Sequence, residues 1–347
     1  MNPRKLVSVV IPVLNEVDTL DALYGRLLST FERASGTDFE VVFVDDGSSD
    51  GSRERIRQIC ARDPRIRLIE LSRNFGHQLA ITAGIDHSAG DGVVVMDGDL
   101  QDPPEVILDM LERWEAGADV VYGVREARLG ESSVKRAAAS VHYRLLRWLS
   151  ETEIPLDSGD FRLISRQVAD ALGEMRESSR YLRGMVAWLG FRQEAVHFQR
   201  DPRYAGEPKY NFRSLLKLSL DGITSFTDRP LKLASQLGLS VTGLAVVYAS
   251  WIIVAKLLDP TRAFQGFSAI MVVVLFLGGV QLFSIGILGQ YLARVYTQSK
   301  GRPLYVVGRR VGWEADPPHR FDPTMDRTFQ DDALEPDAMR ADRWGHR

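Results

Sequence analysis

Five short apolar runs in the first half of the chain each end in polar residues, and this alternation constrains the fold more than any other feature. Segments of helical character separate the runs, which lie at residues 7–13, 39–44, 66–71, 93–96 and 119–122. Strands that alternate with helices form a mostly parallel, doubly wound α/β sheet with helices on both faces. The strand ends gather at one edge of such a sheet, where α/β proteins bind their ligands.

The turn after the first run excludes a dinucleotide-binding fold. Such folds place a glycine-rich turn there to admit a pyrophosphate. This chain instead has Pro12, Asn15 and Glu16 at and after the end of the run. The ligand crevice of the predicted sheet must therefore be built from other groups.

Two carboxylates, Asp97 and Asp99, follow the fourth run and are the first candidates for a metal site. Because side chains alternate along a strand, both can point the same way, and Gln101 continues the series. Mg²⁺ and Mn²⁺ prefer carboxylate and amide oxygens together with the phosphates of a substrate. An isolated Asp-x-Asp is more often a polar turn that ends a strand, so the assignment depends on the other motifs.

Four motifs follow one another along the chain: Pro-Val-x-Asn-Glu at 12–16, Asp-Asp-Gly-Ser at 45–48, Arg-Asn-Phe-Gly at 73–76 and Asp-x-Asp-Leu-Gln-Asp-Pro-Pro-Glu at 97–105. In this order they resemble the motifs of family 2 glycosyltransferases and, more narrowly, of their polyprenyl-phosphate branch. That branch includes dolichol-phosphate mannose synthase and bacterial undecaprenyl-phosphate glucosyltransferases. The resemblance implies a GT-A-type domain that moves a sugar, with inversion, from a nucleoside diphosphate to a polyprenyl phosphate, using Mg²⁺ or Mn²⁺.

The resemblance also implies roles for residues at the strand ends. Those expected to bind the donor are Pro12, Asn15, Glu16, Asp45, Asp46 and Asp97. Of the two adjacent carboxylates, Asp45 is expected to read the base, while Asp46 is open between the donor and a cap on the following helix. A metal held by Asp97, Asp99 and Gln101 would neutralise the departing diphosphate.

A segment further along the chain resembles the family's acceptor region. Residues 157–162 read Asp-Ser-Gly-Asp-Phe-Arg, and in many inverting relatives a carboxylate here acts as general base on a hydroxyl. A phosphate oxygen is already anionic at neutral pH, so Asp157 or Asp160 is expected to orient groups, with Asp157 nearer the reacting centre. Asp99, Asp157 and Asp160 form the predicted catalytic set.

Basic residues in two further places are predicted to bind phosphates. Arg125 follows the fifth strand, and Arg136 and Ser140 lie four apart on the next predicted helix, hence on one face. In the resembling enzymes such residues hold the acceptor phosphate, and Lys135 is an alternative to Arg136 here.

A loop at residues 199–210 resembles the family segment that closes over the donor diphosphate. It supplies Arg200, Arg203 and Lys209 as donor-binding residues. Pro208 stands where serine is usual, which removes one hydroxyl and one backbone donor.

Residues 73–78 have two possible roles, in the ligand cleft or in the turn before the next predicted helix. Arg73 and His77 are candidates to line the cleft, whereas Asn74 and Gly76 suit the turn into the next helix, and Gln78 belongs to the same group.

Two long apolar segments, 233–258 and 266–293, are predicted membrane spans rather than buried bundle helices. Each is long enough to cross a hydrocarbon core of about 30 Å. The stretch 211–232 mixes apolar and charged residues at helical spacing, which predicts amphipathic helices at the membrane interface. Such helices would bring the catalytic cleft down to a lipid phosphate that stays in the bilayer.

Charges around the spans predict that both ends of the chain face the cytoplasm. Basic residues precede the first span and follow the second, whereas the short connecting loop carries Asp259 and Arg262. No cleavable signal is expected, because residues 1–5 lead directly into the first strand. The sequence thus predicts a multi-pass protein of the inner or plasma membrane, with a cytoplasmic catalytic domain at 1–210 and a cytoplasmic tail at 294–347, largely disordered at its end.

Composition agrees with this organisation. The chain has 347 residues and a net charge of −3, which implies no attraction to nucleic acid. Cys60 is the single cysteine, so an intramolecular disulfide and a cysteine-rich metal site are excluded. The family resemblance implies a homo-oligomer, a tetramer.

The predicted function is transfer of glucose from UDP-glucose to undecaprenyl or decaprenyl phosphate, giving a lipid-linked sugar for the cell envelope. Mannose, galactosamine and aminoarabinose donors share the motifs and stay open as alternatives. A processive polysaccharide synthase would need more spans and a Gln-x-x-Arg-Trp-type segment. A membrane scaffold without catalysis would not need Asp97, Asp99 and Asp157 intact.

Overall fold

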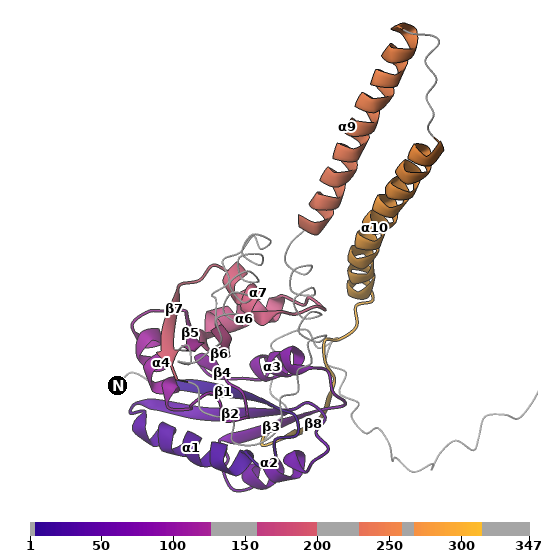
Figure 1. The fold of residues 1–347 in the computed structure, drawn as a ribbon. Helices are drawn as coiled ribbons and strands as arrows, with labels where there is room; N and C mark the ends of the chain where they lie inside the picture. The colour runs from indigo at the N-terminus through magenta and orange to yellow at the C-terminus, as the bar shows by residue number, and fades with distance from the viewer. Residues whose placement is uncertain (1–3, 126–157, 200–228, 259–266, 314–347) are drawn as a thin grey trace, which may run out of the picture.

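The computed structural model describes residues 4–125, 158–199, 229–258 and 267–313. Within these residues eight strands form one sheet (Figure 1). Their bounds are Lys5–Val13 (β1), Thr37–Asp45 (β2), Ile66–Leu71 (β3), Gly92–Val95 (β4), Val120–Arg125 (β5), Ser158–Ser165 (β6), Gln193–Phe198 (β7) and Val307–Val311 (β8). The spatial order is β7-β5-β6-β4-β1-β2-β3-β8.

The predicted parallel α/β sheet is confirmed. Strand β1 pairs in parallel with both β2 and β4, β2 pairs in parallel with β3, and β5 with β7. Three strands were not anticipated from the sequence: β7, and the two antiparallel strands β6 and β8. Strand β6 lies between β4 and β5, and β8 pairs with β3 at the sheet edge.

Helices cover both faces of the sheet, as the apolar strands require. On one face lie α1 (Leu20–Arg33), α2 (Ser52–Cys60) and α4 (Val106–Glu115); on the other lie α3 (His77–Asp86), α6 (Arg166–Glu174) and α7 (Leu182–Trp188) (Figure 1). Side chains that alternate along β1 divide between two cores: Val9 and Ile11 pack under α1, and Val10 under α3.

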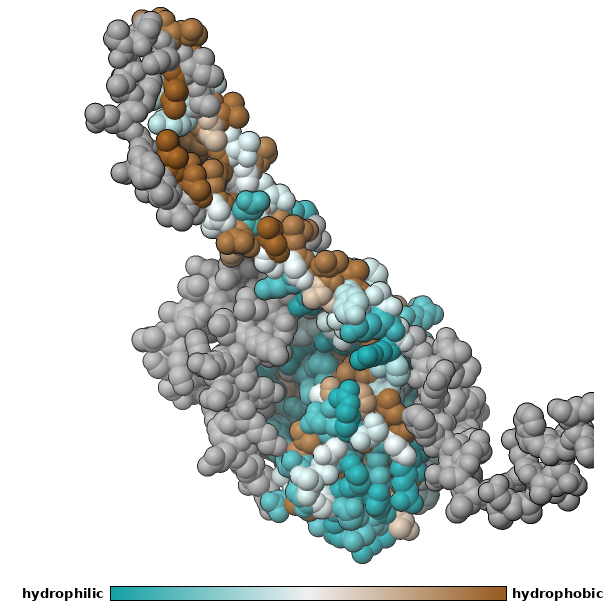
Figure 2. Space-filling model, turned by 90° about the vertical axis from the view of Figure 1, so that its right-hand side faces the viewer, coloured by the Kyte–Doolittle hydropathy of each residue, from teal (hydrophilic) through white to brown (hydrophobic). Residues whose placement is uncertain are grey.

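Two long helices project from the sheet domain, α9 (Arg229–Leu258) and α10 (Phe267–Ser299). Both are long and apolar enough to cross a membrane, at Ala234–Ile252 and Phe276–Ser299, and neither stretch is buried. Figure 2 shows apolar side chains along these projecting helices, in contrast to the largely hydrophilic surface below them. The two apolar helices predicted from the sequence are therefore present, and each extends a few residues beyond its predicted limits on the side of the sheet domain.

The end of α10 is attached to the sheet domain by side-chain hydrogen bonds. The Gln298 side chain accepts a hydrogen bond from the Ser178 backbone at 2.8 Å and donates to the Arg176 carbonyl at 3.0 Å. Beyond the helix, the Tyr305 hydroxyl donates to Asp86 at 2.8 Å before the chain forms β8. The first part of the predicted tail thus returns to the sheet, while residues 314–347 lie outside the described part.

Candidate functional site

The loops after β1 and β2 are held together by the residues expected to bind the donor. The Asn15 side chain, whose backbone has a left-handed φ of 57°, accepts a hydrogen bond from the Ser49 backbone at 2.8 Å. The Glu16 backbone donates to the Ser52 hydroxyl at 2.9 Å. These bonds fix the rim of the crevice at the carboxyl ends of the two strands, and Pro12 lies buried in β1 behind it.

Asp45 is fully buried and occupied by partners within the chain. Its carboxylate accepts hydrogen bonds from the Gly47 and Ser48 backbones and two from the Arg53 guanidinium, the shorter at 2.6 Å. Any contact of this carboxylate with a nucleotide base must therefore compete with Arg53.

Asp46 binds the turn before α3, not the helix that was considered in the sequence analysis. Its two carboxylate oxygens accept hydrogen bonds from the Phe75 and Gly76 backbones at 2.6 and 2.9 Å, directly before α3. Burial raises the pKa of Asp46, and these two hydrogen bonds offset part of that rise. Asp46 thus caps the approach to α3, not the helix that follows it in the chain.

Asp97 and Asp99 both lie, partly exposed, at the end of β4. Asp99 accepts hydrogen bonds from the Gln101 backbone at 3.1 Å and from its side-chain amide at 2.6 Å. Burial raises the pKa of Asp97, and the charges of Asp160 and Asp99 raise it further, against the charges of His77 and Arg125. The site therefore concentrates negative charge where the metal is predicted.

Asp160 faces these carboxylates from β6 and is surrounded by donors. Arg183 Nε donates to it at 2.9 Å, the Gln78 side chain at 3.0 Å, and His77 Nε2 lies 3.2 Å away. Burial by itself would raise the pKa of Asp160, but the hydrogen bond from His77 and the charge of Arg183 hold it well below its usual range. The partners of Asp160 thus stabilise its ionised form.

His77 lies between Asp97, at the end of β4, and Asp160, in β6. Its Nε2 lies 3.5 Å from Asp97 as well as 3.2 Å from Asp160. Burial lowers the pKa of His77, but the hydrogen bond to Asp160 and the charges of Asp97 and Asp160 outweigh it, so the pKa is raised. Of residues 73–78, His77 and Gln78 thus both contact Asp160.

Arg125, at the end of β5, lies against the same segment of β6. It forms a 3.6 Å ion pair with Asp102, which is fully buried. A Cβ added to Gly159 would come within 2.8 Å of the Arg125 guanidinium, which therefore lies directly over that glycine. Arg183 lies outside the motifs, and Asp102 and Gly159 lie within two of them without an assigned role, because the contacts of all three arise only in the folded sheet.

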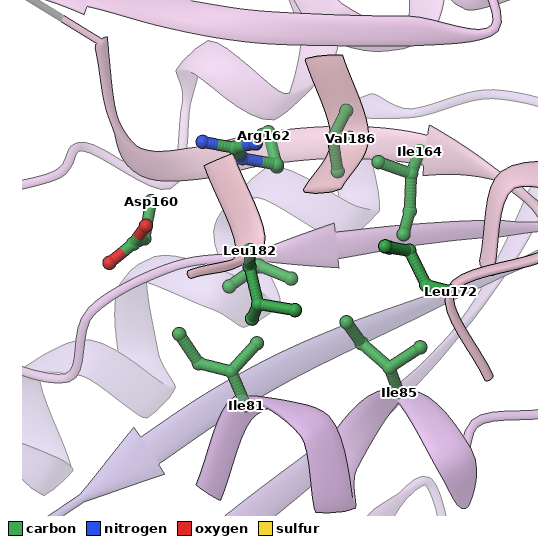
Figure 3. Close-up of a pocket in the computed structure, with 9 residues that line it drawn as sticks. Ile81, Ile85, Asp160, Arg162, Ile164, Leu172, Leu182 and Val186 are labelled. Atoms are coloured by element: carbon green, nitrogen blue, oxygen red, sulfur yellow. The ribbon is translucent and has the colours of Figure 1, made fainter. Parts of the chain in front are cut away.

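A small apolar cavity lies behind Asp160, among α3, β6, α6 and α7 (Figure 3). Its volume is about 10 Å³, roughly what one water molecule requires. Asp160 and Arg162 are among the residues around it, and Ile81, Leu172 and Val186 are among its apolar walls. Arg162 is buried, which lowers its pKa to about 10, and it donates to the Gly159 carbonyl at 3.0 Å. This cavity is too small for a substrate.

Comparison with known proteins identifies both parts of the chain. Residues 8–173 match the model of glycosyl transferase family 2, and residues 229–295 match the GtrB C-terminal hairpin. The chain is 44% identical to the uncharacterized glycosyltransferase YkcC of Bacillus subtilis, over 88% of this chain and 94% of that protein. It is 38% identical to the bactoprenol glucosyl transferase of Shigella phage SfV, over 87% and 97%. The chain belongs to glycosyltransferase family 2.

The alignment with these glycosyltransferases spans the sheet domain and the two apolar helices together. A prophage bactoprenol glucosyl transferase homolog of Escherichia coli is 37% identical over 87% of this chain and 98% of its own length. The matched hairpin covers all of α9 and most of α10, as far as residue 295. Sheet domain and hairpin thus form one shared architecture.

Part of the predicted site of this glycosyltransferase lies outside the described residues. The described members lie at the carboxyl ends of the strands β1, β2, β4 and β5 and beside them in β6. The members outside the description are Asp157, Arg136, Ser140, Arg200, Arg203 and Lys209.

Proposed function

We propose that this glycosyltransferase moves glucose from UDP-glucose to a polyprenyl phosphate at the cytoplasmic face of the membrane. The observation that carries the proposal is the full-length likeness to bactoprenol glucosyl transferases, which covers 97% of the phage SfV enzyme. Bactoprenol is a polyprenol, and the matched hairpin would keep the sheet domain beside such a lipid.

We assign Mg²⁺ or Mn²⁺ to Asp97, Asp99 and Gln101. The raised pKa of Asp97, caused by burial and by the charges of Asp160 and Asp99, marks a repulsion that a cation would relieve. The described residues contain no group of three or more His, Cys, Asp and Glu side chains that could hold a metal unaided. Oxygens of the donor diphosphate would complete the coordination, as is usual for Mg²⁺. When bound, the ion would neutralise charge on the departing diphosphate.

The acceptor needs positioning more than activation. Its phosphate oxygen is already anionic near neutral pH, so it can attack the anomeric carbon as the bond from that carbon to the diphosphate breaks. One displacement of this kind inverts the anomeric centre. Arg125 would hold the acceptor phosphate through a charge-assisted contact, and Asp157 would orient groups beside it.

The membrane arrangement follows from charge. Arg229 and Lys232 lie at the start of α9, and Arg294, Lys300 and Arg302 lie at and after the end of α10. Both of these ends would face the cytoplasm under the positive-inside rule. The sheet domain would then meet its nucleotide-sugar donor on the side where such donors are made.

The proposal is tested by giving the purified full-length protein in lipid vesicles undecaprenyl phosphate and a panel of nucleotide sugars. UDP-glucose should yield a lipid-linked hexose, identified by mass spectrometry, faster than GDP-mannose or UDP-galactosamine. A preference for another donor would mean that the transferred sugar is not glucose, and it would leave the proposed acceptor unchanged. Growth of a polysaccharide would favour a processive synthase, and absence of any turnover would favour a scaffold.

A further inference from the structure

We propose that Asp102 and Gly159 are positioning residues that fix the guanidinium of Arg125 at the reaction site. The inference rests on the proposed function, because it takes Arg125 as a residue that binds the acceptor phosphate. Neither residue would touch the substrate.

Gly159 provides the surface on which the guanidinium lies. A Cβ at this position would be 2.8 Å from one terminal nitrogen of Arg125, 3.3 Å from its central carbon and 3.6 Å from Nε. Three atoms of one planar group within this range mean that the plane of the guanidinium covers the glycine. Any side chain there would push Arg125 away.

The backbone of Gly159 is itself held in place. Its carbonyl accepts the 3.0 Å hydrogen bond from the buried Arg162, and the next residue, Asp160, is tied to Arg183. The glycine therefore cannot easily shift to make room for an added methyl group.

Asp102 supplies the charge that fixes the guanidinium from one edge. It is fully buried, and one of its oxygens lies 3.6 Å from a terminal nitrogen of Arg125. A buried carboxylate without its partner would be an uncompensated charge, so Asp102 favours the position of the guanidinium beside it.

Arg125 also retains access to the reaction site. Its side chain is 31% exposed, so part of the guanidinium can be reached by a ligand. One face of the guanidinium thus rests on Gly159, one edge meets Asp102, and the exposed part is available to an anion. This is the arrangement expected of a pre-organised phosphate receptor.

The test is a set of double-mutant cycles on the full-length protein in vesicles. Gly159→Ala, Asp102→Asn and Arg125→Ala are measured alone, and each of the first two is combined with Arg125→Ala. Each single variant should raise the KM for undecaprenyl phosphate, by about tenfold for Arg125→Ala, and leave the KM for UDP-glucose within about twofold. In the double variants, neither added change should raise the acceptor KM beyond that of Arg125→Ala.

Two matched variants control for general damage. Gly92→Ala also brings a Cβ within 3.3 Å of a side chain, that of Trp114, and Asp63→Asn also removes a buried carboxylate paired with an arginine, Arg65. Both lie away from the reaction site and should change neither KM. If Gly159→Ala alone does not fold, the double variant with Arg125→Ala should fold, because the clashing group is gone.

The inference would be overturned if the increases in acceptor KM of the two single variants multiplied in each double variant. It would also be overturned if folded Gly159→Ala and Asp102→Asn had the acceptor KM of wild type. Failure of the proposed function gives a different result. In that case Arg125→Ala would raise the KM for the donor, and the coupling of Asp102 and Gly159 to Arg125 would appear in that constant.

Discussion

Arg183 Nε donates a 2.9 Å hydrogen bond to Asp160 and so joins α7 to β6 beside the predicted metal site. The bond is one reason why the pKa of Asp160 stays below its usual range despite burial. A carboxylate with a low pKa is a weak base, because it gains little by taking a proton at neutral pH. Asp160 is accordingly expected to organise the site.

Asp160→Asn should lower both turnover and stability, without rescue at high pH. The amide loses charge-assisted bonds to Arg183 and His77, a cost of about 2 kcal/mol in the free energy of unfolding. Because the folded pKa is lowered, the stabilisation by Asp160 is fully present above the unfolded value near pH 4 and is lost only at lower pH. Asp160 also raises the pKa of His77, and the stabilisation from that shift is present below about pH 6 and is lost as His77 gives up its proton. The stability difference between wild type and variant should therefore decrease as the pH rises from about 6 to 9.

Rates and melting temperatures over that pH range check this prediction, with Asp157→Asn measured in parallel. Asp170→Asn, which removes a partly exposed ion pair between Asp170 and Arg166 four residues apart, is the control and should cost about 0.5 kcal/mol. A rate that climbs with pH in either the Asp157 or the Asp160 variant would make that carboxylate the general base.

Asp99→Asn should reduce turnover by about two orders of magnitude or more in a folded protein. The amide keeps the shape of the side chain but lowers the negative charge that would attract the metal. The measurement is activity against Mg²⁺ and Mn²⁺ concentration, with Asp109→Asn, an exposed change on α4, as control. Activity of the Asp99 variant that equals wild type in the presence of a chelator would exclude the metal assignment.

Tyr305→Phe should destabilise the attachment of the chain after α10 by about 1 kcal/mol. It removes the hydroxyl that donates to Asp86 and leaves the ring in place. Hydrogen exchange of β8 would report the loss as faster opening. Tyr296→Phe changes a tyrosine that is 63% exposed on α10 and serves as the control. Equal exchange in both variants would mean that the bond adds nothing to the attachment.

Cys60 should react slowly with iodoacetamide at pH 8 in the folded protein. Burial raises the pKa of its thiol to about 11, and only the thiolate is nucleophilic. In denaturant the thiol regains an ordinary pKa, so alkylation should accelerate by about a hundredfold or more. Because Cys60 is the single cysteine, mass spectrometry of the intact chain follows the reaction directly. Similar rates in both states would contradict the burial of this thiol.

The fold was predictable where burial leaves a periodic apolar signal. The runs that became β1 to β5 are buried on both faces, so their sequences are almost continuously apolar. Strand β6 was missed because Asp160 and Arg162 interrupt its pattern, and their burial is compensated only by partners elsewhere. Strand β8 was missed because it is an edge strand whose Arg309 is exposed, so its sequence resembles a tail.

The site was predictable in its motifs and not in its contacts. Asp97 and Asp99 stand out because they end a strand two residues apart. The partners of Asp160 could not be read from the sequence, because His77 lies 83 positions and Arg183 23 positions away along the chain. Gly159 is informative only once Arg125 is seen to lie over it.

The product formed from UDP-glucose and undecaprenyl phosphate tests the central claim most directly. Purified full-length protein in vesicles should give undecaprenyl phosphate carrying one hexose, with the β-anomeric configuration by NMR, because one displacement inverts the α-linked donor. The Asp99→Asn variant should give almost none. An α-linked product, a sugar on more than one site of the lipid, or release of free glucose without lipid product would contradict the account.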